Sequence, residues 1–225
     1  MKKYFYFLAV ALLTSLAALV SSCKKNKSVP PTDIGTRTPF TEEFENVSQL
    51  ESKGWVFKDL SSAQADWGQG QFGNDKGGKW HGFEAFSYTI DNTEYAYCFL
   101  STDNSNTSSW MITPVLSVKN GDKISFYTRG DTTTAFYTRM QVLMNKMASA
   151  NVGNKLVSTG DFKITLFDIN PNQALGGYPT VWKKYEYTFS DINGRTDTRI
   201  AFRHFVGNNA YAGGIGIDQF RFEVK

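Results

Sequence analysis

The stretch Lys123-Ile124-Ser125-Phe126-Tyr127-Thr128 decides the fold. Its alternate side chains, Ile124, Phe126 and Thr128, share one face if the chain is extended, which is the two-residue period of a β-strand. The same period recurs at residues 140–144, 185–189, 200–203 and 219–224. Many strands and almost no helical pattern predict two packed antiparallel sheets, in an all-β sandwich or jelly roll.

Turn signals separate these stretches and support the same prediction. They are Asn120-Gly121-Asp122, Gly176-Gly177, Asn193-Gly194 and Gly213-Gly214. The one stretch with helical character, residues 144–151, is short. No sustained repeat is present, which argues against a solenoid or a propeller.

Composition places the chain among globular proteins. The 225 residues are 41% hydrophobic, 15% aromatic and 20% charged, which excludes a disordered chain. The formal net charge of +3 is too small to indicate a nucleic-acid partner, and none is expected.

The N-terminus is typical of a secretory signal peptide. Lys2 and Lys3 precede an apolar stretch that runs to Val20 and is interrupted at Thr14. A transmembrane helix needs about 20 uninterrupted apolar residues, so this segment is too short to be one. We expect residues 1–22 to be the signal peptide.

The signal peptide ends Leu19-Val20-Ser21-Ser22-Cys23, which resembles the lipobox of bacterial lipoproteins. The resemblance implies that Cys23 becomes the lipidated first residue, and that acyl chains hold the protein on a membrane. The expected location is the outer membrane, with the protein facing the periplasm or the cell surface. An ordinary signal peptide followed by a chance cysteine is the alternative.

Residues 23–38 are predicted to be the lipidated cysteine and a flexible tether. The tether has Lys24, Lys25 and Lys27, followed by Pro30-Pro31. These lysines either touch anionic headgroups or are simply solvated. The domain that follows, residues 39–225, has 18 basic and 20 acidic residues and therefore a charge of −2. The basic character of the chain belongs to its N-terminal tail.

Cys98 is the single cysteine left if Cys23 is lipidated, so no internal disulfide is expected. It lies in the apolar, strand-like run Tyr95–Leu100, which predicts a buried, inert thiol.

Two acids fall in register with apolar strand faces. Glu42 lies between Phe40 and Phe44, and Asp218 shares parity with Phe220 and the following alternate residues. A lone buried charge is costly, so each needs a basic partner such as Arg203, backbone donors, or a cation such as calcium. The pattern does not choose among these.

Several segments together resemble one family, in order and spacing. They are Phe40-Thr41-Glu42-Glu43-Phe44-Glu45, Gly54-Trp55, Ser109-Trp110-Met111-Ile112-Thr113-Pro114, Lys123–Tyr127, Tyr178–Trp182, Ile200–Phe205 and Gly216-Ile217-Asp218. The chain resembles the choice-of-anchor J and cleaved-adhesin modules, MAM-like jelly-roll domains of bacterial surface proteins, over residues 39–225.

The resemblance implies a non-catalytic recognition or adhesion module, with a structural calcium ion as its cofactor. Carried over by position, the metal candidates are Glu42, Glu45 and Asp218. The family usually has a second acid after the last one, where this chain has Gln219.

Aromatic side chains on polar loops are the candidate ligand contacts. Trp67 and Trp80 flank the polar stretch 68–79, where flat rings either stack on a sugar or anchor a protein partner. The polar candidates beside them are Asp66, Asp75 and His81, and a second loop carries Tyr211. In the alternative, both tryptophan side chains are buried beneath the loop that carries them.

Catalytic motifs are weak, and we expect no enzyme. Gly68-Gln69-Gly70-Gln71-Phe72-Gly73 matches a dinucleotide fingerprint, but no helix pattern follows it. Cys98 and His204 both fall on apolar strand faces, which argues against a catalytic dyad. The predicted function is a lipid-anchored module that binds a glycan or a protein. The alternatives are a structural part of a surface assembly and a glycan hydrolase with paired carboxylates.

Overall fold

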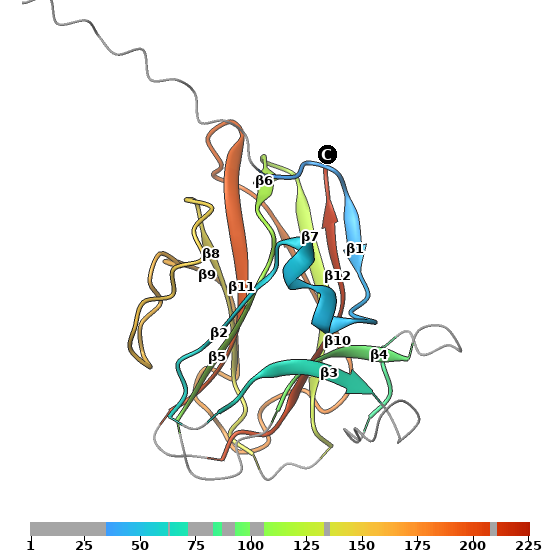
Figure 1. Cartoon of the computed structure of the whole chain (residues 1–225), viewed down its shortest axis with the longest axis vertical. Coiled ribbons are helices and arrows are strands. Elements are labelled where there is room, and N and C mark those ends of the chain that lie inside the picture. The colour runs from blue at the N-terminus through green and yellow to red at the C-terminus, as the bar shows by residue number, and fades with distance from the viewer. Residues whose placement is uncertain are drawn as a thin grey trace, which may run out of the picture. The chain divides into compact units, whose positions relative to one another are not determined.

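The computed structural model describes residues 35–62, 64–71, 83–86, 93–99, 106–132, 136–207 and 211–225. These residues form a sandwich of two antiparallel sheets (Figure 1). The first sheet has the order β10 (Lys183–Thr188), β7 (Lys123–Gly130), β12 (Ile215–Glu223), β4 (Glu94–Cys98) and β3 (Trp67–Gln71), and β1 (Phe40–Glu42) also pairs with β12. The predicted all-β fold is confirmed.

The second sheet has the order β2 (Val56–Asp59), β5 (Thr107–Ile112), β11 (Thr196–Val206), β8 (Met140–Asn145) and β9 (Ile164–Ile169). The short strand β6 (Leu116–Val118) also pairs with β11. Two 3-10 helices, η1 (Val47–Gln49) and η2 (Glu51–Lys53), connect β1 to β2.

The core lies between the sheets and follows the predicted alternation. Ile124 and Phe126 of β7 are fully buried, as are Ile200 and Phe202 of β11. The Phe126 ring packs edge-on against Phe202 of the opposite sheet, with centroids 5.0 Å apart. Such aromatic pairs stabilise the contact beyond the area they bury.

Residues 144–151, the stretch with helical character in the sequence, do not form a helix. Met144 and Asn145 end strand β8, and the Asn145 side chain then turns the backbone by accepting from Met147 N–H and donating to Ser149 O. A side chain that satisfies nearby backbone groups competes with helix formation. The helical turns in the described residues are η1 and η2 instead.

Asp218 is not on the apolar face that its parity predicted. The pairing of β12 with β7 shifts between Asp218 and Arg221, and Gln219 has a positive φ of 47°. This β-bulge reverses the alternation, so that Ile217 and Phe220 both face the core between the sheets. Asp218 lies on the other face of the first sheet beside Tyr127, where it is still fully buried.

The outer face of the first sheet carries a second aromatic layer. Tyr95 and Tyr97 of β4 pack there with Phe83, and the partly buried Phe99 and Trp182 join them. Glycines make room for these rings. A Cβ on Gly70 would lie 2.3 Å from the Tyr95 ring, and one on Gly68 would lie 2.9 Å from Phe99. The Gly68-x-Gly70 pattern therefore reflects packing on strand β3 and not a nucleotide loop.

Asp122 joins the two ends of the domain. It is fully buried and accepts hydrogen bonds from the Arg37 guanidinium, Lys225 N–H at 2.9 Å and Lys119 N–H at 2.7 Å. Burial raises the pKa of its carboxyl, but these donors outweigh burial and lower the pKa below the usual value.

Candidate functional site

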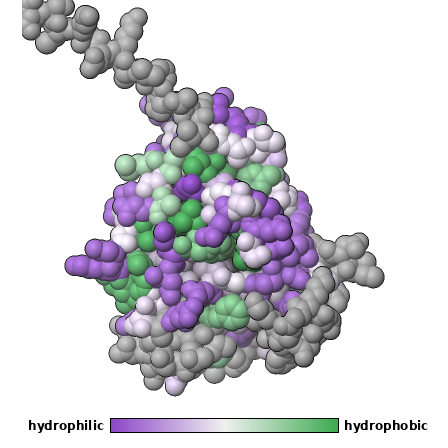
Figure 2. Space-filling model, in the orientation of Figure 1, coloured by the Kyte–Doolittle hydropathy of each residue, from purple (hydrophilic) through white to green (hydrophobic). Residues whose placement is uncertain are grey.

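A cleft of about 510 Å³ opens beside strand β1, between the two sheets. We call it the β1 cleft. The residues that line it are Thr36, Thr38, Phe40, Glu42, Lys53, Gly54, Trp55, Pro114, Val115 and Arg199. Its volume is that of a typical small-ligand pocket. Hydrophobic side chains gather among hydrophilic ones toward the upper part of the face in Figure 2, around β6.

Interruptions in both sheets create the β1 cleft. On β11, strand β5 gives way to β6 at Thr113-Pro114-Val115, because proline has no N–H for the ladder. Along one side of β12, strand β4 pairs with residues up to Ile217. Beyond the bulge, strand β1 takes its place. Strand β1 from the first sheet and Pro114-Val115 beside the second line the cleft at this level.

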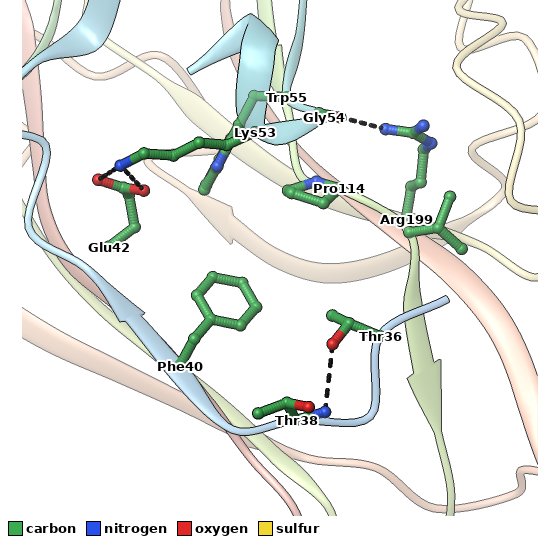
Figure 3. A pocket seen from close by; sticks show the side chains of 10 residues that line it. Thr36, Thr38, Phe40, Glu42, Lys53, Gly54, Trp55, Pro114 and Arg199 are labelled. Atoms are coloured by element: carbon green, nitrogen blue, oxygen red, sulfur yellow. Dashed lines mark hydrogen bonds and ion pairs between the residues drawn. The ribbon is translucent and has the colours of Figure 1, made fainter. Parts of the chain in front are cut away.

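Gly54 shapes the upper wall of the β1 cleft. It ends η2 with φ of 88°, a left-handed conformation that favours glycine. The turn sends Trp55 into the core, where its ring packs edge-on against Phe44 and Phe220 at 5.4 and 5.6 Å. Trp55 is 2% exposed, so the ring that a ligand meets is Phe40. Figure 3 shows Phe40 pointing into the space below Lys53 and Pro114.

Glu42 and Lys53 form an ion pair on one rim of the β1 cleft. Lys53 Nζ lies 2.9 and 3.2 Å from the two carboxylate oxygens (Figure 3). The Glu42 side chain is 10% exposed and the Lys53 side chain 50%. Two of the partners left open for Glu42 in the sequence are present: a basic residue, which is Lys53 and not Arg203, and a backbone donor, Phe44 N–H at 3.3 Å.

Arg199 lies on the opposite rim. Its Nη1 donates to Gly54 O at 3.0 Å and to Thr113 O at 2.6 Å, and its Nε donates to Ala148 O at 3.0 Å. Partial burial lowers the pKa of its guanidinium. The sequence did not single out Arg199, because its contacts come from segments far apart in the chain.

A second cleft of about 510 Å³, the β3 cleft, is lined by Val47, Ser48, Glu51, Phe57, Trp67, Gly68 and Gln69. Trp67 was predicted to flank a polar loop, but it begins strand β3 and is 8% exposed. Its indole Nε1 is buried without a hydrogen bond within the described part of the chain. Asp66 beside it is exposed and accepts from the Gln64 amide.

The other described ligand candidate, Tyr211, does not line either cleft. Tyr211 is 46% exposed and lies near Tyr137, since Tyr137 N–H donates to Tyr211 O at 3.0 Å. Asp75, Trp80, His81 and the lipidation candidate Cys23 lie outside the described residues. A role in ligand binding stays a prediction for Tyr211, Asp75, Trp80 and His81, and lipidation stays a prediction for Cys23.

The three metal candidates are not brought together. Glu42 is held by Lys53, whereas Glu45 accepts from Glu94 N–H at 3.2 Å and Asp218 from Phe86 N–H at 2.8 Å. Burial raises the pKa of Asp218 to about 7, and the charges of Glu43 and Glu45 add to the rise. Across the described ranges, no three acidic, histidine or cysteine side chains are grouped as a metal site. A calcium site stays a prediction for Glu42, Glu45 and Asp218.

Cys98 and His204 do meet, but in the core. His204 Nδ1 lies 3.4 Å from Cys98 Sγ, and both residues are fully buried. Burial raises the pKa of the Cys98 thiol and lowers the pKa of His204 to about 3. A neutral thiol and a neutral imidazole without access to solvent do not act on a substrate, so the expected burial of both is confirmed.

Comparison with solved structures shows the fold. The K1 cleaved adhesin domain of Lys-gingipain from Porphyromonas gingivalis W83 matches with a TM-score of 0.53 at 18% identity, over 84% of this chain and 99% of that one. The K2 cleaved adhesin domain of Lys-gingipain matches with a TM-score of 0.54 at 15% identity, over 83% and 100%. This chain therefore has the β-sandwich fold of the cleaved adhesin domains, as its segments indicated.

Sequence comparisons add no family. No family model and no curated protein matches the chain. Among the described residues, no helix has the length and apolar character required to span a bilayer.

Proposed function

We propose that this protein is a non-catalytic recognition module outside the cytoplasm, anchored to the outer membrane through a lipid on Cys23, and that it binds a glycan in the β1 cleft. The cleft carries this proposal: it combines a half-buried aromatic ring, two threonines and charged groups of both signs. Sugar-binding sites need such a combination, because a sugar has both an apolar face and hydroxyl groups.

The β1 cleft suits a glycan better than the β3 cleft. The β3 cleft also has a half-buried aromatic residue, Phe57, but its Trp67 offers 8% of its surface, and its described lining has one charged residue, Glu51, and no positive group. In the β1 cleft, Phe40 is half-buried, and the exposed Thr38 stands next to it at the mouth.

A glycan array followed by calorimetry tests the proposal. Thr38→Trp fills the mouth without removing a core contact, and it should lower the affinity for the array hits at least about tenfold, or about 1.4 kcal/mol. Tyr211→Ala, on a loop outside the cleft, is the matched control and should leave the affinity unchanged.

Two results would contradict the proposal. An array that stays blank with calcium present would argue against glycan binding. A loss of binding with Tyr211→Ala and not with Thr38→Trp would move the site to the loops. If the array is blank and one protein co-purifies with both variants alike, a structural role in a surface assembly explains the protein better.

A further inference from the structure

The charges around the β1 cleft do not cancel. The lining has three charged side chains, Glu42, Lys53 and Arg199. Glu42 and Lys53 neutralise each other through a close ion pair, with an N–O distance of 2.9 Å. Arg199 then leaves the cleft with one positive charge.

Within the described residues, the Arg199 guanidinium donates to backbone carbonyl groups and not to a carboxylate. Its hydrogen bonds within the described residues all go to backbone carbonyls, those of Gly54, Thr113 and Ala148. These contacts use Nε and Nη1, so Nη2 has no hydrogen bond to a described residue. Carbonyls fix the orientation of the guanidinium but leave its charge uncompensated, which favours an anionic ligand.

Two arginines in the domain, Arg37 and Arg139, contrast with Arg199, whereas Arg203 also donates to uncharged acceptors, those of Ser108, Gln141 and Leu156. Arg37 donates to the carboxylate of Asp122, and Arg139 donates to that of Asp168 at 2.7 Å through Nε. Both therefore meet an acid inside the protein. At Arg199 the corresponding acid is missing from the described partners, and the residue lines the β1 cleft.

We propose that the β1 cleft selects acidic sugars, with the sugar carboxylate on Arg199 and the apolar face of the ring against Phe40. This inference rests on the proposed function and names its ligand class. A planar guanidinium matches a carboxylate better than it matches a hydroxyl.

Ligand pairs test the inference on the unaltered protein. Oligogalacturonate, a hyaluronan tetrasaccharide and sialyllactose are each compared with the same sugar after methyl esterification of its carboxyl groups. At least one acid should bind about tenfold more tightly than its ester, and the difference should shrink as salt is raised, because the pair is partly exposed.

A variant locates the effect. Arg199→Gln should remove the preference for the acid, so that acid and ester bind alike, whereas Lys184→Gln, an exposed residue of β10, should keep the preference. Thermal unfolding checks that the variant folds. If Arg199→Gln does not fold, Glu42→Gln provides the test. One negative charge fewer in the cleft should increase the preference for the acid over its ester.

The outcomes separate the two proposals. Equal binding of acids and esters, abolished by Thr38→Trp, overturns the acidic-sugar inference and supports the glycan site. A preference for the acid that persists in Arg199→Gln overturns the assignment to Arg199. Absence of binding to every acid and ester overturns both.

Discussion

His204 shows how a single buried side chain sets a pH dependence. Its pKa falls from 6.5 to about 3 because the imidazole is fully buried, whereas the unfolded chain keeps the ordinary value. Between these two values the unfolded state binds the extra proton. Stability is therefore complete above about pH 6.5 and is lost as the pH falls toward 3.

The His204→Gln variant isolates this effect. Between pH 7 and pH 5 the native protein should lose about 2 kcal/mol of unfolding free energy more than the variant does, at 1.36 kcal/mol per pKa unit. Urea unfolding at both pH values measures the difference. Parallel losses in the two proteins would mean that His204 is protonated in the folded state.

Gly70 tests the aromatic layer outside the first sheet. Gly70→Ala places a methyl group 2.3 Å from the Tyr95 ring, and overpacking of this kind costs about 1–3 kcal/mol. Gly207→Ala is the control, because nothing lies within 4 Å of its added Cβ. Chemical denaturation should separate the two, and equal stabilities would show that Tyr95 moves aside freely.

For single residues, the sequence predicted well which side chains are buried, and less well on which face of the sheet each side chain lies. Alternation correctly placed Ile124, Phe202 and His204 in the core, because a regular strand has a strict period of two. It failed at Asp218, because one residue in the left-handed region, Gln219, reverses the faces. A bulge of this kind leaves no mark in an alternation of apolar and polar residues.

Among the elements, the contact of Arg37 with Asp122 ties the segment before β1 to the turn before β7. Arg37→Gln leaves a fully buried carboxylate without its cation, and should cost about 3 kcal/mol. Lys184→Gln breaks an exposed pair with Glu186 and should cost under about 1 kcal/mol. Thermal unfolding of both variants provides the comparison, and equal losses would show that the Asp122 contact is replaceable.

A calcium ion bound by Asp218 and Glu45 would join strand β12 to the segment after β1. A ligand that binds only the folded state at about one hundred times its dissociation constant stabilises by about 2.7 kcal/mol. Chelation should therefore lower Tm, and calcium should restore it. Asp218→Asn should no longer respond. An unchanged Tm after chelation, in protein purified without chelator, would end the calcium hypothesis.

The β1 cleft is the element-level feature that the sequence did not predict. Its walls come from residues 36–42, 53–55, 114–115 and 199, and no local spacing joins them. Pro114 and Gly54 did stand in segments that resemble the family, but as parts of its fold. The charge left on Arg199 depends on which carboxylates lie near it, and only the three-dimensional arrangement decides that.

For the whole molecule, the anchor prediction concerns location and not binding. Cys23→Ser should release the protein from the membrane fraction, because the acyl chains supply about 0.8 kcal/mol per buried methylene. Binding of glycans by the released protein should be unchanged. Fractionation followed by immunoblotting measures the first effect, and a variant that stays with the membrane would show that Cys23 is not the attachment point.

The meeting of Arg37 with the last residue has a consequence for how such a sandwich is reused. Arg37 Nη2 donates to Lys225 O at 3.4 Å, so the segment that precedes strand β1 lies beside the segment that follows strand β12. A domain with adjacent ends fits into a surface turn of a host protein without stretching it. The domain can therefore be inserted into another protein with its β1 cleft intact.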